Sequence, residues 1–174
     1  MRGPTKDNLS LTADDVRTEA HARLKGALSL TASGYSVNAD MLIDVLLHAA
    51  ATGRSVEGAC DDLLSVADAN TAREYLNGQL TDAKLDILEH RMNQALGAEL
   101  PRKVRRAKLD IALDLHDQPF YGKTAALREK ACRGEARDGT TRFFRIASAY
   151  VMLGGVRVTL AVVFVTPALD LPLI

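Results

Sequence analysis

The hydrophobic pattern of this chain changes its period near Pro101, and this change constrains the fold more than any other feature. Before Pro101, apolar residues recur every three to four positions, as they do on one face of an α-helix. After it, apolar and polar residues alternate, which is typical of β-strands. A helical part followed by strands predicts an α+β fold with two parts, 1–100 and 101–174. We expect their junction between about Gly97 and Arg105.

Start and stop signals predict four or five helices in the first part. Asp14 and Asp15 fall in the first turn of one helix, where the helix dipole favours acidic residues. Asn38 is a candidate cap for the second helix, which ends before Gly53. The predicted helices cover about 12–28, 38–52, two short stretches within 55–80, and 81–96.

The segment 55–80 divides into two short helices with about five residues between them. Ser55 can cap the first, and Thr71-x-x-Glu74 matches a capping box for the second. The residues expected to point inward are Val56, Cys60, Leu63, Leu64, Ala72, Tyr75 and Leu76. This outline matches a helix-turn-helix, whose second helix enters the DNA major groove. The residues that would face DNA are Asn70, Thr71, Arg73 and Asn77. A plain helical hairpin has the same spacing and remains the alternative.

Three strands are expected in the second part. In the first, Leu109, Ile111, Leu113 and Leu115 alternate with other residues until Pro119 and Gly122 enforce a turn. Strands at 142–153 and 156–165 follow, joined by Gly154-Gly155, a strong hairpin signal. A two-residue loop there pairs Leu153 with Val156 and Ala149 with Leu160. Both faces of this hairpin are then mostly apolar and need cover, for which this part has few residues left.

The net charge of zero hides an uneven distribution. Residues 1–100 contain nine Lys or Arg against fifteen Asp or Glu, whereas residues 101–174 contain thirteen against seven. The basic part begins with a cluster at Arg102, Lys103, Arg105, Arg106 and Lys108. Such a cluster is suited to DNA phosphates, although a solvated run of charges is an equal alternative.

Several classes of protein are excluded. The two cysteines, Cys60 and Cys132, lie far apart without the spacing of a zinc site, so neither a disulfide framework nor a zinc finger is expected. The first fifteen residues lack the apolar run of a signal peptide. The most apolar stretch, Val158 to Val165, is much shorter than the roughly 20 residues that span a membrane. We therefore expect a cytoplasmic protein without a membrane partner.

Asp114 is the leading candidate for chemistry. It is expected at the C-terminal end of an apolar strand, where a buried carboxylate needs a metal or cation partner. Asp110 would lie roughly 13 Å away along the strand, too far to share a two-metal site. His116 and Asp117 follow in the predicted turn and are within reach of a metal at Asp114, although this pattern in a turn more often caps the backbone. Cys132 is expected to be a structural thiol.

Two segments of the second part, LDLHDQPFYGK and RDGTTRFFRIASAYVMLGGVRVTLAVVFVTP, carry a family resemblance. They resemble the start of the catalytic domain of DDE transposases from prokaryotic insertion sequences, closest to a group common in haloarchaea. The segments MLIDVLLHAAATGRSVEGACDDL and ADANTAREYL resemble the helical region that precedes that domain. The resemblance extends from about Asp40 to Pro167.

This resemblance implies an RNase H-like domain whose first three strands are antiparallel. It also implies three acidic residues that hold two Mg²⁺ ions for DNA cleavage and strand transfer, with Asp114 as the first. Pro119, Tyr121 and Gly122 match the loop after it. DNA and a homo-oligomer would be the partners.

The second Asp and the Glu of this family lie downstream of the third strand and have no counterpart here. The expectation is therefore a truncated transposase without cleavage activity and with weak or absent Mg²⁺ binding. A small DNA-binding protein is the alternative, and a two-part soluble fold with a fortuitous resemblance is a third.

Overall fold

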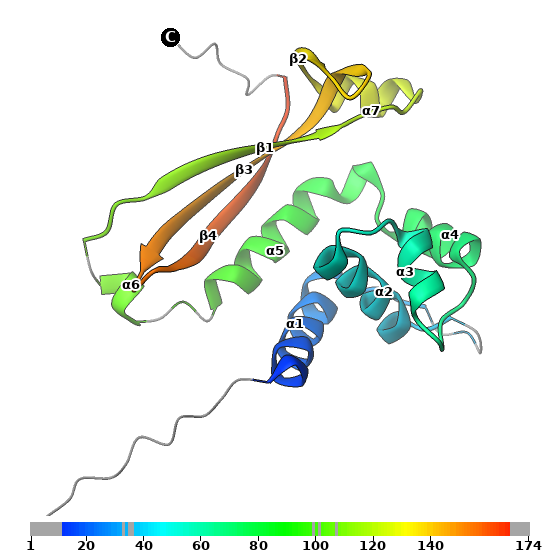
Figure 1. Cartoon of the computed structure of the whole chain (residues 1–174), viewed down its shortest axis with the longest axis horizontal. Coiled ribbons are helices and arrows are strands. Elements are labelled where there is room, and N and C mark those ends of the chain that lie inside the picture. Colours follow the sequence, from blue (N-terminus) through cyan, green and yellow to red (C-terminus); the bar gives the residue numbers. More distant parts are fainter. Residues whose placement is uncertain are drawn as a thin grey trace, which may run out of the picture. The chain divides into compact units, whose positions relative to one another are not determined.

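The computed structural model describes residues 12–32, 34, 37–98, 100, 102–106 and 108–167 (Figure 1). Helices come first and a four-stranded antiparallel sheet follows, which confirms the predicted α+β fold. By their internal contacts the residues form two compact units, Met1–Leu80 (unit 1) and Thr81–Ile174 (unit 2).

Unit 1 consists of helices whose N-terminal caps are polar side chains. Thr12 and Asp15 cap each other reciprocally at the first helix, and Asn38 accepts a hydrogen bond from the Met41 N–H at 2.9 Å. Ser55 accepts from the Gly58 N–H at 3.1 Å. The caps at Asn38 and Ser55 agree with the sequence prediction, whereas the cap at Thr12 was not predicted. The helices are α1 (Ala13–Leu28), α2 (Ala39–Thr52), α3 (Val56–Asp62) and α4 (Ala69–Gln79).

The start of α4 differs from the prediction. Asp68 is the cap: its carboxylate accepts from the N–H groups of Asn70 and Thr71, and from the Thr71 hydroxyl at 2.6 Å. The Thr71 hydroxyl, followed by the Thr71 N–H, holds the pKa of Asp68 below its usual value. The predicted capping box from Thr71 to Glu74 is wrong, because Thr71 already lies inside the first turn.

The core of unit 1 is centred on α2. Leu42, Ile43 and Val45 are completely buried there, and they pack in one cluster with residues of α3 and α4. The predicted inward positions of Cys60, Ala72 and Leu76 are confirmed.

Two other inward predictions in this unit are wrong, since Leu64 is fully exposed and Tyr75 is also exposed. The physical reason for Leu64 is that α3 ends at Asp62 and the next residue, Leu63, has an extended backbone. Leu64 therefore leaves the helical face on which its spacing would place it.

Unit 2 contains a sheet built around one long strand. Strand β3 (Thr140–Leu153) pairs antiparallel with β1 (Ala112–Pro119) on one edge, and with β2 (Cys132–Arg137) and β4 (Val156–Val165) on the other. Three strands were predicted, and β2 is the one that the pattern missed. The helical segments of the unit are η1 (Asp82–Lys84), α5 (Leu85–Ala98), α6 (Arg102–Arg106) and α7 (Ala125–Lys130).

The hairpin of β3 and β4 turns at Gly154 and Gly155, which both have positive φ, as predicted. The predicted register holds from Leu153 opposite Val156 to Tyr150 opposite Thr159. A bulge then shifts the pairing, so that Ala149 lies opposite Ala161. The predicted pair of Ala149 with Leu160 is therefore wrong, as is every predicted pair beyond it.

Helix α5 packs along β4, and polar side chains of α5 bond to the outer edge of that strand. The Asn93 side-chain amide both donates to and accepts from the Val162 backbone at 2.8 Å, and Glu89 accepts from the Phe164 N–H at 2.7 Å. These contacts protect the edge of β4. They also explain why the units divide after Leu80, whereas the sequence analysis placed the junction beyond α5.

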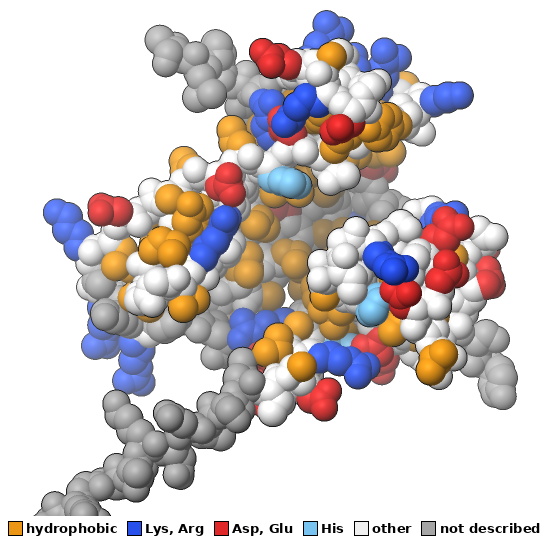
Figure 2. Space-filling view, in the orientation of Figure 1, with side chains coloured by type: hydrophobic (Ala, Val, Ile, Leu, Met, Phe, Trp, Pro, Cys, Tyr) orange, Lys and Arg blue, Asp and Glu red, His pale blue; other side chains and the backbone are white. Residues whose placement is uncertain are grey.

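The sheet leaves large apolar side chains in contact with solvent. Those on its strands are Leu113, Leu115, Ile146, Met152, Val156 and Val163. They belong to both faces of the sheet, because paired residues share a face and the two faces alternate along each strand. Figure 2 shows hydrophobic side chains at the surface where the sheet lies. The cover of this sheet is therefore incomplete within the described residues.

Both cysteines are buried and neither is part of a disulfide, and the Cys132 thiol donates to the Val165 carbonyl at 3.4 Å. Burial raises the pKa of the Cys60 thiol, which favours its unreactive protonated form. The most apolar stretch of the sequence, 158–165, lies in β4. None of the described helices has the length and apolar composition of a membrane-crossing segment.

Candidate functional site

Asp114 belongs to a polar cluster on one face of the sheet. The register places it opposite Ser148 on β3. Arg157 of β4 reaches across: its Nη1 lies 3.4 Å from Asp114 Oδ2, and its Nη2 donates to Ser148 Oγ at 2.8 Å. The same guanidinium lies 3.9 Å from the centre of the Tyr150 ring, a cation–π contact. In this cluster, therefore, the charged neighbour of Asp114 is the positively charged side chain of Arg157.

The surroundings of Asp114 differ from those predicted. It is the third residue of β1, and its side chain is 52% exposed, so no burial penalty drives it toward a metal. Among the described residues, no group of three or more His, Cys, Asp or Glu side chains has the arrangement of a metal site. A single carboxylate binds Mg²⁺ weakly, because this ion gives up its water reluctantly.

His116 and Asp117 lie in β1 and not in a turn, because the strand continues to Pro119. His116 lies opposite Ile146 and shares the face of Asp114, whereas Asp117 lies opposite Arg145 on the other face. Arg145 Nε and Arg137 Nη2 lie 2.8 Å and 3.0 Å from the Asp117 carboxylate. The hydrogen bond from Arg145 is the main reason that the pKa of Asp117 is lowered. Asp117 therefore cannot join Asp114 in one metal site.

Three residues of the loop after β1, Phe120, Tyr121 and Gly122, make structural contacts. The Phe120 ring lies 4.6 Å from the Phe144 ring, which in turn lies 5.5 Å from Phe164. A Cβ at Gly122 would come within 2.5 Å of the Phe120 ring, so only glycine fits there. The Tyr121 hydroxyl donates to the Asp138 carbonyl at 2.6 Å and thereby fixes the turn between β2 and β3.

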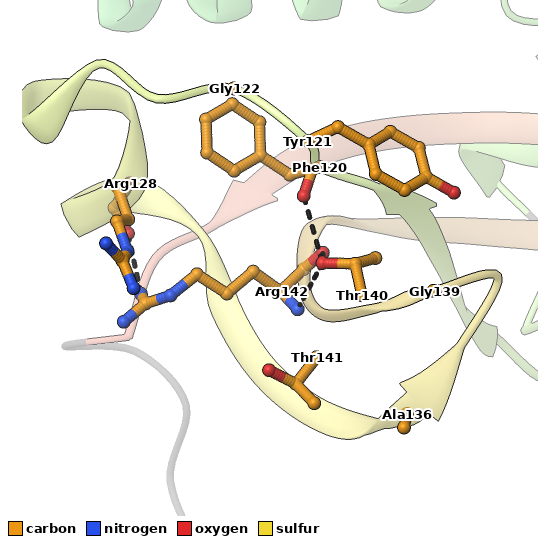
Figure 3. Close-up of a pocket in the computed structure, with 9 residues that line it drawn as sticks. All are labelled: Phe120, Tyr121, Gly122, Arg128, Ala136, Gly139, Thr140, Thr141 and Arg142. Carbon is orange, nitrogen blue, oxygen red and sulfur yellow. Dashed lines mark hydrogen bonds between the residues drawn. The ribbon is translucent and has the colours of Figure 1, made fainter.

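The same loop lines a cavity of about 570 Å³ at the β2–β3 end of the sheet (Figure 3). Its only charged lining residues among those described are arginines, Arg128 and Arg142, and Arg142 Nη1 donates to the Arg128 carbonyl at 2.9 Å. The Thr140 hydroxyl donates to the Phe120 carbonyl at 3.0 Å. Two cations beside hydroxyl groups suit an anionic ligand such as a phosphate. Sequence reasoning missed this cavity because its walls come from three places, the loop after β1, α7 and the β2–β3 turn, which only the folded sheet brings together.

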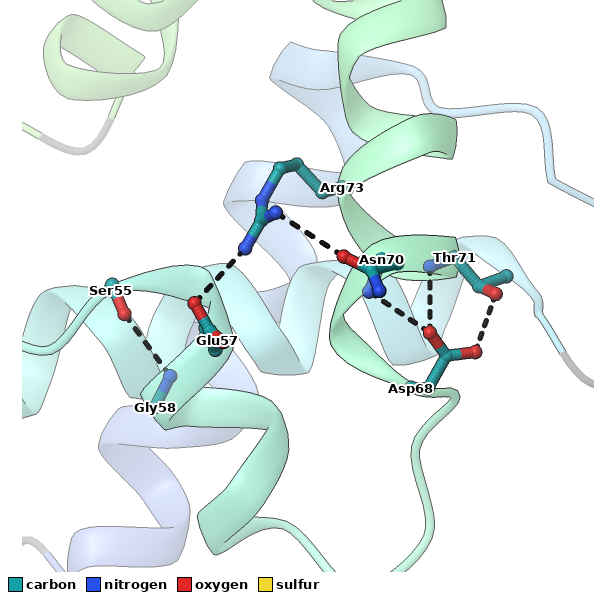
Figure 4. A network of polar contacts seen from close by, with 7 residues as sticks. All are labelled: Ser55, Glu57, Gly58, Asp68, Asn70, Thr71 and Arg73. Atoms are coloured by element: carbon teal, nitrogen blue, oxygen red, sulfur yellow. Dashed lines mark hydrogen bonds and ion pairs between the residues drawn. The ribbon is translucent and has the colours of Figure 1, made fainter.

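Of the four residues predicted to read DNA on α4, Asn70, Arg73 and Asn77 are exposed. Thr71 is half-buried, and its hydroxyl is bonded to the capping Asp68. Arg73 pairs with Glu57 of α3 at 3.3 Å and contacts the Asn70 side chain at 3.4 Å (Figure 4). The structure thus brings three of the four residues to one exposed surface, where Arg73 forms an ion pair with Glu57.

The first four residues of the predicted basic cluster lie on the short helix α6, and Lys108 follows that helix. Arg102, Arg105 and Arg106 are exposed there, while the side chain of Lys103 lies outside the described residues. Arg105 Nη2 donates to the carbonyls of Gly97 and Ala98 at 3.2 Å and 2.8 Å. These carbonyls end α5, so Arg105 also stabilises the negative end of that helix.

Comparison with known proteins found no match to this chain among family models, curated proteins or solved structures.

Proposed function

We propose that this chain is a transposase-like protein that binds DNA through unit 2 and does not cut or join it. The observation that carries the proposal is the position of Asp114. It lies in the first strand of an antiparallel sheet and is followed by the Pro119–Gly122 loop. The transposase resemblance implies this arrangement for the first catalytic aspartate.

Binding to DNA is supported by the charges of unit 2. Residues 81–174 contain fifteen Lys or Arg against eleven Asp or Glu, while residues 1–80 contain seven against eleven. Exposed arginines of α6 and the two arginines of the cavity supply candidate phosphate contacts. Contacts of this kind give affinity that depends on salt and little on sequence.

The absence of cleavage is proposed from the contacts of Asp114. Two-metal chemistry needs carboxylates that converge on ions about 4 Å apart. Arg157 lies beside Asp114, and Asp117 points to the opposite face of the sheet. A guanidinium next to the carboxylate opposes the binding of a cation there, because like charges repel.

We expect the purified chain to leave supercoiled plasmid DNA intact in Mg²⁺ and in Mn²⁺. The measurement is the conversion of supercoiled to nicked or linear plasmid on a gel, with the Asp114→Ala variant as the matched control. Equal background in both proteins is the expected result, because a lone carboxylate does not assemble the metal pair. Nicking by the parent chain that disappears in Asp114→Ala would overturn the proposal.

We expect replacement of Arg102, Lys103 and Arg106 by alanine to weaken the dependence of DNA affinity on salt. Each lost phosphate contact lowers the slope of log K against log salt by about 0.9, so the slope should fall by about 2.7. Arg105 is kept because it closes α5. The measurement is a fluorescence anisotropy titration of a labelled duplex at several salt concentrations.

The control for this experiment removes three arginines from unit 1, namely Arg17, Arg23 and Arg54, and should leave the slope unchanged.

A second candidate function is that of a small DNA-binding protein that uses α4, and it is favoured by the exposed surface of Asn70, Arg73 and Asn77. If the variant with alanine at Arg102, Lys103 and Arg106 keeps the slope of the parent chain, α6 is not part of the interface with DNA, and α4 becomes the leading candidate.

A further inference from the structure

Strand β1 forms an open edge of the sheet in unit 2. Within the described residues it pairs with β3 alone. On the opposite edge, Asn93 and Glu89 of α5 bond to the outward backbone groups of β4. An edge strand with unprotected N–H and C=O groups is a template for pairing with another strand.

The hydrogen-bond pattern shows which backbone groups of β1 face outward. The Phe120 N–H donates to the Arg142 carbonyl at 2.9 Å, so residue 120 bonds toward β3. In an antiparallel pair such bonding alternates along the strand. The residues whose backbone groups bond toward β3 are therefore Ala112, Asp114, His116 and Gln118, and those facing outward are Leu113, Leu115 and Asp117. The next residue whose backbone faces outward is Pro119. It has no N–H to donate, as is usual for a proline on an edge strand.

On β1, Leu113, Leu115 and Asp117 lie on one face of the sheet, and Asp114 and His116 lie on the other. Leu113 and Leu115 are 79% and 53% exposed on one face, a large exposure for two leucines in one strand. Asp114 and His116 are exposed on the other face. The strand has no lysine, the residue that most often protects a sheet edge from association.

We propose that β1 pairs antiparallel with β1 of a second copy of this chain, with Leu115 opposite Leu115 at the centre. In this register the outward backbone groups of Leu113, Leu115 and Asp117 meet each other across the two-fold axis. Asp114 of each copy then lies opposite His116 of the other, which gives two cross-strand pairs of acid and imidazole. On the other face the two Leu115 side chains lie opposite each other, and each Leu113 lies opposite Asp117 of the other copy.

Charge complementarity selects this register over its neighbours. A pairing centred on Asp114 would set the two Asp114 carboxylates opposite each other, and like charges at such positions destabilise a sheet. A pairing centred on His116 would set the two imidazoles opposite each other and Leu113 opposite Pro119, which has no N–H to donate. Of these three registers, only the one centred on Leu115 sets Asp114 opposite His116.

The proposed interface is small, since it consists of one short strand and a few side chains from each copy. Interfaces of this size fall in the class of weak and reversible complexes. We therefore expect a monomer–dimer equilibrium that shifts with protein concentration. Dimerisation does not depend on the proposed DNA binding, and the test below contains no DNA, so the two proposals can fail separately.

The test is sedimentation equilibrium of the full chain over a concentration series. The parent should dimerise. The His116→Asp variant sets Asp114 opposite a carboxylate twice and should weaken dimerisation about tenfold or more. The double variant Asp114→His with His116→Asp exchanges the partners and should restore dimerisation to within about threefold of the parent, since a carboxylate and an imidazole meet again. Met152→Asp places the same new charge on an exposed residue of β3 that has no partner on β1, and it should dimerise like the parent.

Circular dichroism of each variant checks that it is folded. We expect the variants to fold, because the substituted side chains are exposed. A parent chain that stays monomeric throughout the series would overturn the proposal. Association that His116→Asp leaves unchanged would also overturn it, because the copies would then meet through another surface.

Discussion

Replacement of Leu42 by alanine is expected to lower the free energy of unfolding of unit 1 by about 2–5 kcal/mol. The Leu42 side chain is 0% exposed and packs at the centre of the cluster that joins α2 to α3 and α4. Its removal loses the transfer free energy of the side chain and leaves a cavity that the neighbours fill only in part. The measurement is urea unfolding followed by the helical circular dichroism signal.

The matched control is Leu64→Ala, the same substitution at a fully exposed position of the same unit. It should change the free energy of unfolding by less than about 0.5 kcal/mol, as is usual at exposed sites. Equal effects of the two substitutions would contradict the assignment of the core.

Replacement of Asp117 by asparagine is expected to destabilise unit 2 by about 1.5–3 kcal/mol at neutral pH, the range for hydrogen bonds to charged groups. Its side chain is 18% exposed and lies between two arginines, and the substitution leaves Arg145, which is 17% exposed, without its anionic partner. The measurement is thermal or urea unfolding of both proteins across a range of pH.

The pH dependence of this effect has a definite sign. Arg145 lowers the pKa of Asp117 in the folded protein, so folding favours the ionised carboxylate. The stabilisation is complete above the unfolded pKa of about 3.9 and is lost as the pH falls through the lower folded value. The difference in the free energy of unfolding between the parent and Asp117→Asn should therefore disappear at acidic pH.

Asp114→Asn is the matched control, because Asp114 is half exposed and its nearest cation lies 3.4 Å away. Exposed pairs contribute about 1 kcal/mol at most. A larger loss from Asp114→Asn than from Asp117→Asn would contradict the ranking of these two carboxylates.

The contrast between Asp114 and Asp117 shows how a strand separates residues that are close in sequence. They are three positions apart, so the alternation of the strand sends them to opposite faces. On one face Asp114 contacts Arg157 at the surface, and on the other Asp117 is held by Arg145 and Arg137. The carboxylate expected to help a metal site thus has a structural role.

The sequence by itself determined the features that depend on neighbours a few residues away. The caps at Thr12, Asn38 and Ser55 join groups three residues apart, so their chemistry is visible in a short window. The Gly154-Gly155 loop is equally local, because positive φ is a property of those residues alone.

The tertiary structure alone decided the features that depend on distant contacts. Helix α5 belongs to the sheet because Asn93 bonds to Val162, 69 positions away, and no periodicity reveals such a partner. The bulge in the hairpin and the arginine partners of Asp114 and Asp117 likewise depend on which strands meet. Local backbone preferences act within a few residues, whereas burial, register and ion pairs are set by segments that only folding brings together.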